Sequence, residues 1–566
     1  MTYDIVLIHP PSLLDFRMHP SYGGPISEVV PSLYVFDMYP FGFLTLASYL
    51  ESKGFKVGIF NIASKMLSSG RFDPVRFLEK LDAKVYGIDL HWLVHAQGAL
   101  KVASIVKRKH PNSIVMLGGL TASYYWREIL ENYSYVDVVM LGDTTEAPVE
   151  KLIENIGDES SFREIPNLAW RNDGRILFNG FAYVPEEFSH LINPRILVSN
   201  AIKTRDIFMT VPYYGFVKKP IVAILTVKGC LYNCVTCGGS CYTYQKYYGR
   251  TKPAFKKPEI VKAEVEELSG IIDAPIFVVG DLTMAGSKYA SDLLKALGGL
   301  GLENEIFFEV YRPVNREIIR FMRRVSDKVY LQISPESPYE DVRSAFGRNY
   351  DNSTLEKMIS SALDVGLERL DLYFMTGLPK QTYRKAVGVA KYYKHLQEKF
   401  ECGSKIDVFT APLAPFVDPG SRVFDYPGKY GYKILWRSLE EYQKAVEQPY
   451  WGLMLNYETE WMNRLLLVRA SINASLELAK AKYKYHVIGK AQLEALNERL
   501  KFDLMISDRA FKGEIRGIEE GKKYMFKEYE ATEDLYPSRS LVECLKVPIH
   551  LKIALQLMLW YSKLTS

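Results

Sequence analysis

Short apolar runs alternate with amphipathic helical patterns in two separate blocks of this chain, and this alternation restricts its fold more than any other feature. In the first block the apolar runs have the length of strands and resemble strands that helices cover on both faces of a parallel sheet. These runs cover residues 5–8, 57–60, 85–90, 114–117 and 136–141. Helical patterns lie between them, for example at 43–53 and 96–109. Residues 1–150 are therefore predicted to form a doubly wound, Rossmann-like α/β domain.

The alternation stops over residues 151–215, which look irregular and are predicted to connect two domains, and then resumes. Six further strands are predicted at 221–227, 276–279, 306–310, 329–333, 370–375 and 406–411. Helical patterns such as those at 259–269 and 355–365 lie between them. Six βα units predict a partial (β/α)6 barrel over 216–420, with its chemistry at the carboxyl ends of the strands. Residues 421–566 are predicted to form a mostly helical C-terminal domain.

The composition is that of a globular protein, with 48% hydrophobic and 24% charged residues in a chain of 566. The formal charge of +5 is spread along the chain and gives no argument for nucleic-acid binding. A Lys/Arg-rich stretch at 246–257 is predicted to be a solvated loop rather than a phosphate site. The chain has no signal-peptide pattern, and no apolar run reaches the ~20 residues of a membrane helix. A cytoplasmic protein is therefore expected.

Three of the six cysteines, Cys230, Cys234 and Cys237, lie within eight residues, directly after the first strand of the second block. In a reducing compartment such a group binds metal more readily than it forms disulfides. Three thiolates leave one iron of a [4Fe–4S] cluster without a protein ligand. That iron can chelate the amino and carboxylate groups of S-adenosylmethionine (SAM) and pass an electron to its sulfonium. A zinc site with Cys241 as fourth ligand is the alternative, but position and spacing favour the cluster.

The motif Cys-x3-Cys-x2-Cys after a first barrel strand is the radical SAM signature, and the preceding domain resembles the cobalamin-binding domain of the B12-binding radical SAM class. The segments that carry this likeness are Ile8-His9-Pro10-Pro11-Ser12, Gly118-Gly119 and Leu141-Gly142-Asp143. The resemblance covers roughly residues 1–420. The whole chain is also similar to an uncharacterised subfamily of this class, through motifs at 235–240, 333–337 and 414–420.

The resemblance implies that SAM meets residues at the later strand ends of the barrel. In chain order these are Asp281 for the methionine amino group, Ser334 and Glu336 for the ribose and carboxylate, and Met375 and Gly377 near adenine. Asp281 follows Gly280 where the family often has a Gly-Gly-Glu motif, so the match is partial. The residue before the third cysteine is usually aromatic and touches adenine. Here it is Thr236, so adenine needs another apolar contact.

The resemblance also implies cobalamin in the N-terminal domain. Its candidate contacts are His9, Ser12, His91, Trp92, Gly118, Gly119, Thr121 and Gly142. The Asp-x-His-x-x-Gly loop that supplies a cobalt ligand in one type of cobalamin domain is absent after the first strand. The loop after the third strand often lies beneath the corrin in this class. His91 could therefore ligate cobalt, Trp92 could cover its lower face, or the histidine could be structural. Glycines at 118 and 119 could admit the nucleotide tail. Loss of the cofactor, with the domain kept as a scaffold, also stays open.

Two enzymatic functions remain open. The first is cobalamin-dependent methylation of an unactivated carbon; the second is radical carbon–carbon coupling or cyclisation, for example ring formation in archaeal membrane lipids. A cluster-bearing sensor or scaffold is a non-enzymatic alternative, disfavoured by SAM-contact positions at several strand ends. The expected partners are a small-molecule or lipid-like substrate and an electron donor of the ferredoxin or flavodoxin type. The apolar segment 547–560 is predicted to form a helix that packs on the core. Peripheral contact of this helix with a membrane surface is the more specific alternative.

Overall fold

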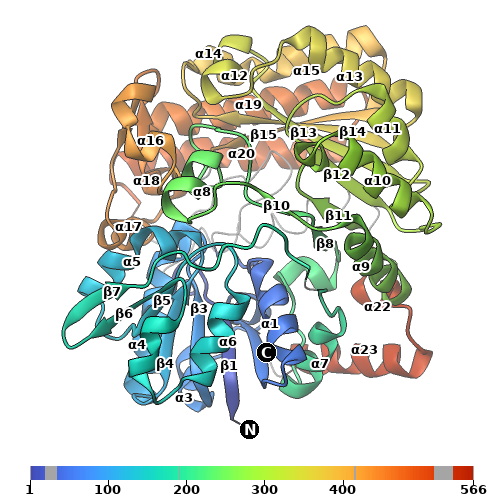
Figure 1. The fold of residues 1–566 in the computed structure, drawn as a ribbon. Coiled ribbons are helices and arrows are strands. Elements are labelled where there is room, and N and C mark those ends of the chain that lie inside the picture. Colours follow the sequence, from blue (N-terminus) through green and yellow to red (C-terminus); the bar gives the residue numbers. More distant parts are fainter. Residues whose placement is uncertain (1, 19–34, 190, 414–415, 516–538, 565–566) are drawn as a thin grey trace.

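The computed structural model describes residues 2–18, 35–189, 191–413, 416–515 and 539–564 (Figure 1). Residues 414 and 415, which open one of the family-like motifs, lie outside this description. An N-terminal sheet occupies the lower part of the view, and a second parallel sheet with its helices lies above it (Figure 1). The three-part architecture expected from the sequence, Rossmann-like sheet, partial barrel and helical C-terminal part, is confirmed.

The N-terminal sheet has the strand order β2-β1-β3-β4-β5-β6-β7, and its first five strands are parallel. These five are β1 (Tyr3–His9), β2 (Val57–Asn61), β3 (Ala83–Asp89), β4 (Ile114–Gly118) and β5 (Val138–Met140). Alternate side chains of β1 enter two different cores: Ile5 and Leu7 pack with helices α1 (Gly42–Ser52) and α6 (Glu146–Glu154), whereas Val6 and Ile8 pack with α4 (Ala96–Lys109). The strand order reverses between β1 and β3, and open α/β sheets bind ligands at such a switch point.

The segment expected to be irregular contains regular structure that belongs to this sheet. Strands β6 (Leu168–Asn172) and β7 (Arg175–Phe178) form an antiparallel hairpin that extends the sheet beyond β5. Its turn residues Asp173 and Gly174 both have positive φ angles, of 48° and 74°. Asp-Gly is the typical signal for such a turn. The strands are only five and four residues long, and β7 is only partly buried, so their apolar alternation is weak.

The second sheet has six parallel strands in the order β15-β14-β13-β12-β11-β8, as predicted for a partial barrel. These are β8 (Val222–Leu225), β11 (Ile276–Val279), β12 (Ile306–Val310), β13 (Val329–Glu336), β14 (Arg369–Thr376) and β15 (Ile406–Pro412). Apolar side chains on one face pack against helices that include α9 (Pro258–Ile271), α10 (Ser287–Gly298), α13 (Asn352–Val365) and α15 (Val389–Phe400). The carboxyl ends of β8 and β11, at Leu225 and Val279, line a space that is shared with the N-terminal domain.

The C-terminal part is mostly helical. Helices α19 (Arg464–Lys484) and α20 (Lys490–Phe511) pack on each other, and α19 lies against β15, the edge strand of the second sheet. A buried ion pair of 2.8 Å between Lys482 and Asp407 fixes that contact. The helix thereby covers a strand edge that would otherwise be open to pairing. Helices α22 (Leu541–Cys544) and α23 (Ile549–Leu564) return to the lower part of the molecule, near α7 (Arg195–Thr204) (Figure 1). Among the described helices, none has the length and apolarity needed to span a bilayer.

Candidate active site

A cavity of about 1480 Å³ lies between the two sheets. This exceeds the ~300–1,000 Å³ of most small-molecule sites. The N-terminal domain contributes Gly42, Gly87, Asp89, Met116, Gly118, Gly119 and Met140 to its wall, and the barrel contributes Ala223, Leu225, Lys228, Phe277 and Val279. The cavity therefore joins the switch point of the first sheet to the interior of the second, beside the loop that carries the cysteines.

Five of the predicted cobalamin contacts line this cavity, namely His91, Trp92, Gly118, Gly119 and Gly142. A Cβ atom added to Gly118 would have a carbonyl oxygen of Met140, at 3.9 Å, as its nearest described neighbour. One added to Gly42 would meet no described atom within 4 Å. The backbone is therefore directly accessible from the cavity at Gly118, which ends β4, and at Gly42, which begins α1. A large, mostly apolar space with backbone walls suits a bulky cofactor that approaches the main chain closely.

His9 lies beneath this wall rather than in it. Its Nδ1 is 2.8 Å from Asp89 Oδ2, and its Nε2 donates to the carbonyl oxygen of Phe36 at 3.0 Å. The same carbonyl accepts from His95 Nε2 at 2.9 Å. Burial alone would raise the pKa of Asp89, but the hydrogen bond and charge of His9 lower it. His9 therefore ties β1 to β3 and does not itself line the cavity. Ser12, also fully buried, accepts from the Gly98 amide through its carbonyl.

The loop after β3 is held rigidly against the cavity. Thr121, which does not line the cavity, donates its hydroxyl to the carbonyl oxygen of His91 at 2.9 Å. The His91 amide donates to Asp89 Oδ1 at 2.8 Å. Gly119 has φ of 108°, and a Cβ there would lie 2.6 Å from the Cα of His91. Burial lowers the pKa of His91, which keeps its imidazole neutral, the form that binds metals. Whether His91 or Trp92 faces cobalt stays a prediction.

The cysteine loop follows β9 (Val227–Lys228) and is buried against the second sheet and the segment after β15. The Tyr232 amide donates to Cys230 Sγ and the Gly239 amide to Cys237 Sγ, both at 3.3 Å. Burial raises the pKa of all three thiols, that of Cys234 to about 11. Thiolates at these positions need a positive partner, and iron supplies one when it binds. By its chemistry this set of three thiols fits an iron–sulfur cluster, although among the described residues no three His, Cys, Asp or Glu side chains are gathered closely enough to hold a metal ion.

A β-bulge orients Glu336 at the carboxyl end of β13. The pairing of β13 with β14 shifts register between Ile333 and Glu336, where Pro335 has no amide to donate. Glu336 adopts φ of 70°, a conformation that residues other than glycine rarely take. Its Oε1 lies 3.6 Å from Arg348 Nη2, and its buried Oε2 has no partner among the described residues. Burial raises the pKa of Glu336 to about 7. This oxygen is therefore available to accept a hydrogen bond from a bound molecule.

Arg348 is a site residue that sequence reasoning missed. Its guanidinium donates to the carbonyl oxygen of Tyr311 at 3.0 Å and lies over the rings of Tyr232 and Tyr311. Its charge opposes the effect of burial on the thiol pKa values of Cys230 and Cys234. Arg348 comes after α12 (Glu340–Phe346), outside the strand ends, so no motif signals it. Arg348 thereby links Glu336, at the end of β13, to Tyr232 in the cysteine loop.

The other predicted SAM contacts have well-defined neighbours. Asp281 is fully buried and accepts from the Tyr311 amide at 2.9 Å and from Thr283. It therefore holds the loops after β11 and β12 together. The Gly377 amide donates to Gln381 Oε1 at 2.7 Å, and a Cβ on Gly377 would lie 2.5 Å from the Tyr457 hydroxyl. Ser334 and Met375 are partly accessible at the ends of β13 and β14. Their contact with SAM stays a prediction.

We expect Glu336→Gln to weaken SAM binding by roughly 10- to 100-fold, because a charged hydrogen bond contributes about 1.5–3 kcal/mol. Iron content should not change, since Glu336 is not among the cysteine ligands. Equilibrium dialysis with labelled SAM on the reconstituted protein measures the effect. Glu356→Gln is the matched control, because Glu356 lies on α13 and pairs with Lys399 and His395 of α15 rather than with a residue of the cysteine loop. Equal SAM affinity in wild type and Glu336→Gln would show that this strand end does not line the SAM pocket.

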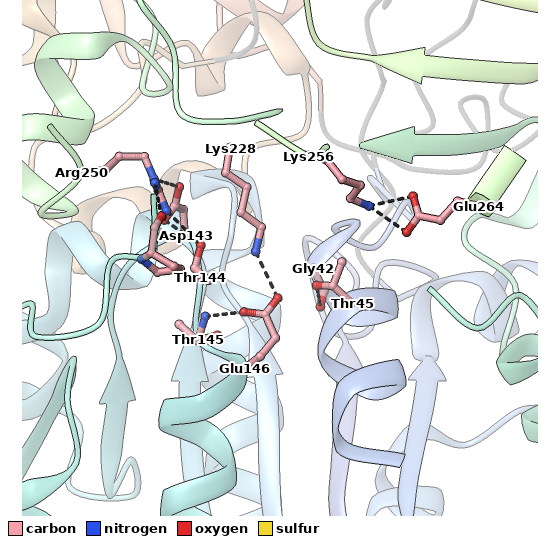
Figure 2. Close-up of polar contacts among 11 residues, drawn as sticks. Gly42, Thr45, Asp143, Thr144, Thr145, Glu146, Lys228, Arg250, Lys256 and Glu264 are labelled. Atoms are coloured by element: carbon pink, nitrogen blue, oxygen red, sulfur yellow. Dashed lines mark hydrogen bonds and ion pairs between the residues drawn. The ribbon is translucent and has the colours of Figure 1, made fainter. Parts of the chain in front are cut away.

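Three ion pairs lie where the two sheets meet, and Figure 2 shows them side by side. Lys228 Nζ is 3.1 Å from Glu146 Oε1, Arg250 Nε is 2.6 Å from Asp143 Oδ2, and Lys256 Nζ is 2.7 Å from Glu264 Oε2. The prediction of a solvated loop at 246–257 is therefore wrong for Arg250 and Lys256, whose side chains are 2% and 0% exposed. Lys228 and Arg250 find carboxylates from distant segments, and Lys256 finds one eight residues further along the chain.

We expect Glu146→Gln to destabilise the protein by about 3–5 kcal/mol, because it leaves the Lys228 ammonium buried without its counter-charge. The side chains of Lys228 and Glu146 are only 8% and 4% exposed. Thermal unfolding measures the loss, and adding Lys228→Met should restore most of it. Glu187→Gln, which breaks an exposed ion pair with Lys257, should have no measurable effect. A Tm for Glu146→Gln equal to that of wild type would contradict the role of this pair.

Comparisons with known proteins agree with this architecture. The family model described as the B12 binding domain matches residues 29–151, and that of the Radical SAM superfamily matches residues 224–392. The hopanoid C-3 methylase of Methylococcus capsulatus is 21% identical over 317 residues, which are 55% of this chain and 55% of that protein. An uncharacterised methyltransferase of Pyrococcus horikoshii is 22% identical over 400 residues, 68% of this chain and 78% of that protein.

Two solved structures share the fold. The cobalamin-dependent SAM radical enzyme OxsB, solved with aqua-cobalamin, has a TM-score of 0.56 at 12% identity and covers 100% of this chain and 80% of its own. The methyltransferase TsrM of Kitasatospora setae, solved with cobalamin and a [4Fe–4S] cluster, has a TM-score of 0.53 at 13% identity, over 77% of this chain and 81% of its own. At these identities the likeness concerns the fold.

The chain belongs to the B12-binding radical SAM superfamily. Its two matched domains are those of radical SAM enzymes and imply a [4Fe–4S] cluster, SAM and cobalamin as cofactors. Enzymes of this kind act on small molecules and receive electrons from a donor. The expected superfamily, fold and cofactors are confirmed. Because the hopanoid C-3 methylase match covers only 55% of that protein, the reaction and the substrate of this chain are matters of proposal.

Proposed function

We propose that this chain methylates an unactivated carbon in a cobalamin-dependent radical SAM reaction. The observation that carries the proposal is the shared cavity. Gly118, at the carboxyl end of β4, and Lys228, next to the cysteine loop, line the same space. A substrate in that space is accessible to both halves of the molecule. The two curated relatives, named as a methylase and a methyltransferase, support the same reaction type.

Each group has a proposed set of residues. Cys230, Cys234 and Cys237 would hold the cluster; Asp281, Ser334, Glu336, Met375 and Gly377 would surround SAM; and the glycine-lined wall of the N-terminal domain would hold cobalamin. When bound, these groups supply a 5′-deoxyadenosyl radical and a transferable methyl group. The protein positions the substrate carbon between them and, through the apolar wall, keeps water away from the radical. A small electron-transfer protein of the ferredoxin or flavodoxin type is the proposed reductant.

Radical coupling or cyclisation would share the hydrogen-abstraction step but would need no methyl carrier. The open, glycine-lined space at the switch point favours methylation, because a domain kept only as a scaffold has no need of a cavity there. At Gly87, on β3, the wall is closely packed instead. A Cβ atom on Gly87 would lie 3.1 Å from Leu7 Cδ2 and 3.2 Å from Met116 Cε, both residues of the cavity wall.

Reconstitution with hydroxocobalamin tests the premise of this function. We expect close to stoichiometric cobalt after desalting of protein that also carries a complete cluster. The retained cobalt should stay with the protein on a second desalting step, as expected for a cofactor enclosed between two domains. Near-zero cobalt in protein with a full complement of iron would reject methyl transfer. Coupling or cyclisation would then be the leading function.

A further inference from the structure

The cavity opens to the surface through a mouth formed by apolar side chains. Met38, Val198, Ile202, Ile221 and Leu551 all line the cavity and are all exposed, Ile202 by 64%. They come from the segment before α1, from helix α7, from the segment before β8 and from helix α23. Exposed apolar side chains that lie singly need no explanation, but a group around one opening marks an interaction surface.

Helix α23 extends this apolar surface beyond the mouth. Leu555 and Leu559 pack against the core formed by residues such as Phe216 and Leu541. Ile549, Ile553 and Leu557, spaced four residues apart, are exposed by 71%, 49% and 60%. Residues four apart share one face of a helix. The helix thus has one apolar face toward the protein and a second toward solvent, as in helices that lie in a membrane interface.

Basic residues outnumber acidic ones in the segments that form the mouth, although Lys203 pairs with Glu51 of α1 at 3.2 Å and Asp37 also lines the cavity. Between residues 195 and 221 the sequence has Arg195, Lys203, Arg205, Lys218 and Lys219, with Asp206 as the sole acidic residue. Asp206 is itself paired with Lys65 at 2.7 Å. From residue 545 to the end of the chain the sequence has lysines but no acidic residue. Lys218 and Lys219 line the cavity itself. An apolar patch with a basic border is complementary to an anionic lipid surface.

We infer that the mouth formed by α7, the segment before β8 and α23 docks on an anionic lipid bilayer, from which a lipid substrate enters the cavity through its hydrocarbon part. A protein partner or second copy on this surface would close the opening, whereas a bilayer covers it and supplies apolar ligands through it. Ile192, Leu268, Ile271 and Leu545 continue the apolar wall inward from the mouth. The substrate class rests on the proposed function; the docking surface does not.

Cosedimentation of the reconstituted full chain with vesicles tests the docking. Wild-type protein should bind phosphatidylglycerol-containing vesicles, bind pure phosphatidylcholine vesicles more weakly, and lose the difference at high salt. Ile549→Gln/Leu557→Gln should weaken binding by at least ~tenfold, because it removes two apolar side chains from the contact. Leu466→Gln/Met505→Gln, at exposed positions on α19 and α20, should bind as wild type.

Equal vesicle binding by the α23 variant and wild type, or no vesicle binding by wild type, would overturn the inference. So would a concentration-dependent dimer in wild type that the same two substitutions abolish, because a second copy would then cover the mouth. Circular dichroism of both variants checks that they remain folded. Vesicle binding requires no turnover, so a protein that binds vesicles but transfers no methyl group would reject the proposed reaction and leave the docking surface in place.

Discussion

Replacing Cys230, Cys234 and Cys237 together by Ala should abolish the iron–sulfur cluster and, with it, SAM cleavage. Wild-type protein prepared without oxygen should contain about four iron and four sulfide per chain, the content of one cubane cluster. The triple variant should contain essentially none and should lose the absorbance near ~400 nm that the cluster gives. The reason is that Cys241 would be the one thiol left in this loop, and a single thiolate cannot hold a cubane cluster.

Cys241→Ala is the matched control for this experiment. Cys241 lies four residues after Cys237, and its Sγ accepts from Gln245 Nε2 at 3.3 Å. Its backbone amide also donates to the carbonyl oxygen of Tyr232 at 2.8 Å, a contact that Ala retains. The control should keep a full cluster. Iron retained in the triple variant, or lost in Cys241→Ala, would show that the proposed ligand set is wrong.

Gly118→Trp should nearly eliminate cobalamin binding while leaving the cluster intact. Gly118 ends β4 at the cavity wall, and its nearest described contact for an added Cβ is 3.9 Å away. The backbone therefore accepts a side chain, and an indole ring would fill space that the corrin needs. Cobalt and iron counted on the same reconstituted sample measure the two effects separately. We expect the iron content of wild type with only residual cobalt.

Gly70→Trp is the control for added bulk, since Gly70 is exposed, lies outside the cavity wall and has no described atom within 4 Å of an added Cβ. It should bind cobalamin as wild type does. Undiminished cobalt in Gly118→Trp would place the cofactor elsewhere, because no corrin could share the wall with an indole at that position.

Much of the fold follows from local patterns. All the strands expected in the two blocks are present, since continuous apolar runs between helical patterns specify buried parallel strands. The β6–β7 hairpin was not expected, because its strands are short and its outer strand is only partly buried. Its Asp173-Gly174 turn was the available signal. The basic stretch that contains Arg250 and Lys256 was misassigned because charge alone does not reveal a buried carboxylate partner.

In the candidate site, too, local sequence signals were predictive, whereas contacts between distant segments were not. Glycines at strand ends and the cysteine spacing are local signals, and the structure brings Gly118, Gly119 and Gly142 to one cavity wall. His9 and Thr121 are also predicted cofactor contacts; their side chains bond to Asp89 and to the His91 carbonyl and do not line the cavity, and their contact with cobalamin stays a prediction. Such positions depend on contacts between distant segments. Arg348 was missed for the same reason, since its partners Glu336 and Tyr311 come from other strand ends.

The fate of a labelled methyl group tests the central claim most directly. Fully reconstituted enzyme, a reductant and SAM carrying a CD3 group would be incubated with vesicles made from the lipids of the source cells. Mass spectrometry would follow every lipid that changes as 5′-deoxyadenosine accumulates. We predict a product in which one hydrogen on carbon is replaced by the CD3 group. A product that instead has lost two hydrogens and carries no label would contradict methylation and identify the reaction as radical ring closure.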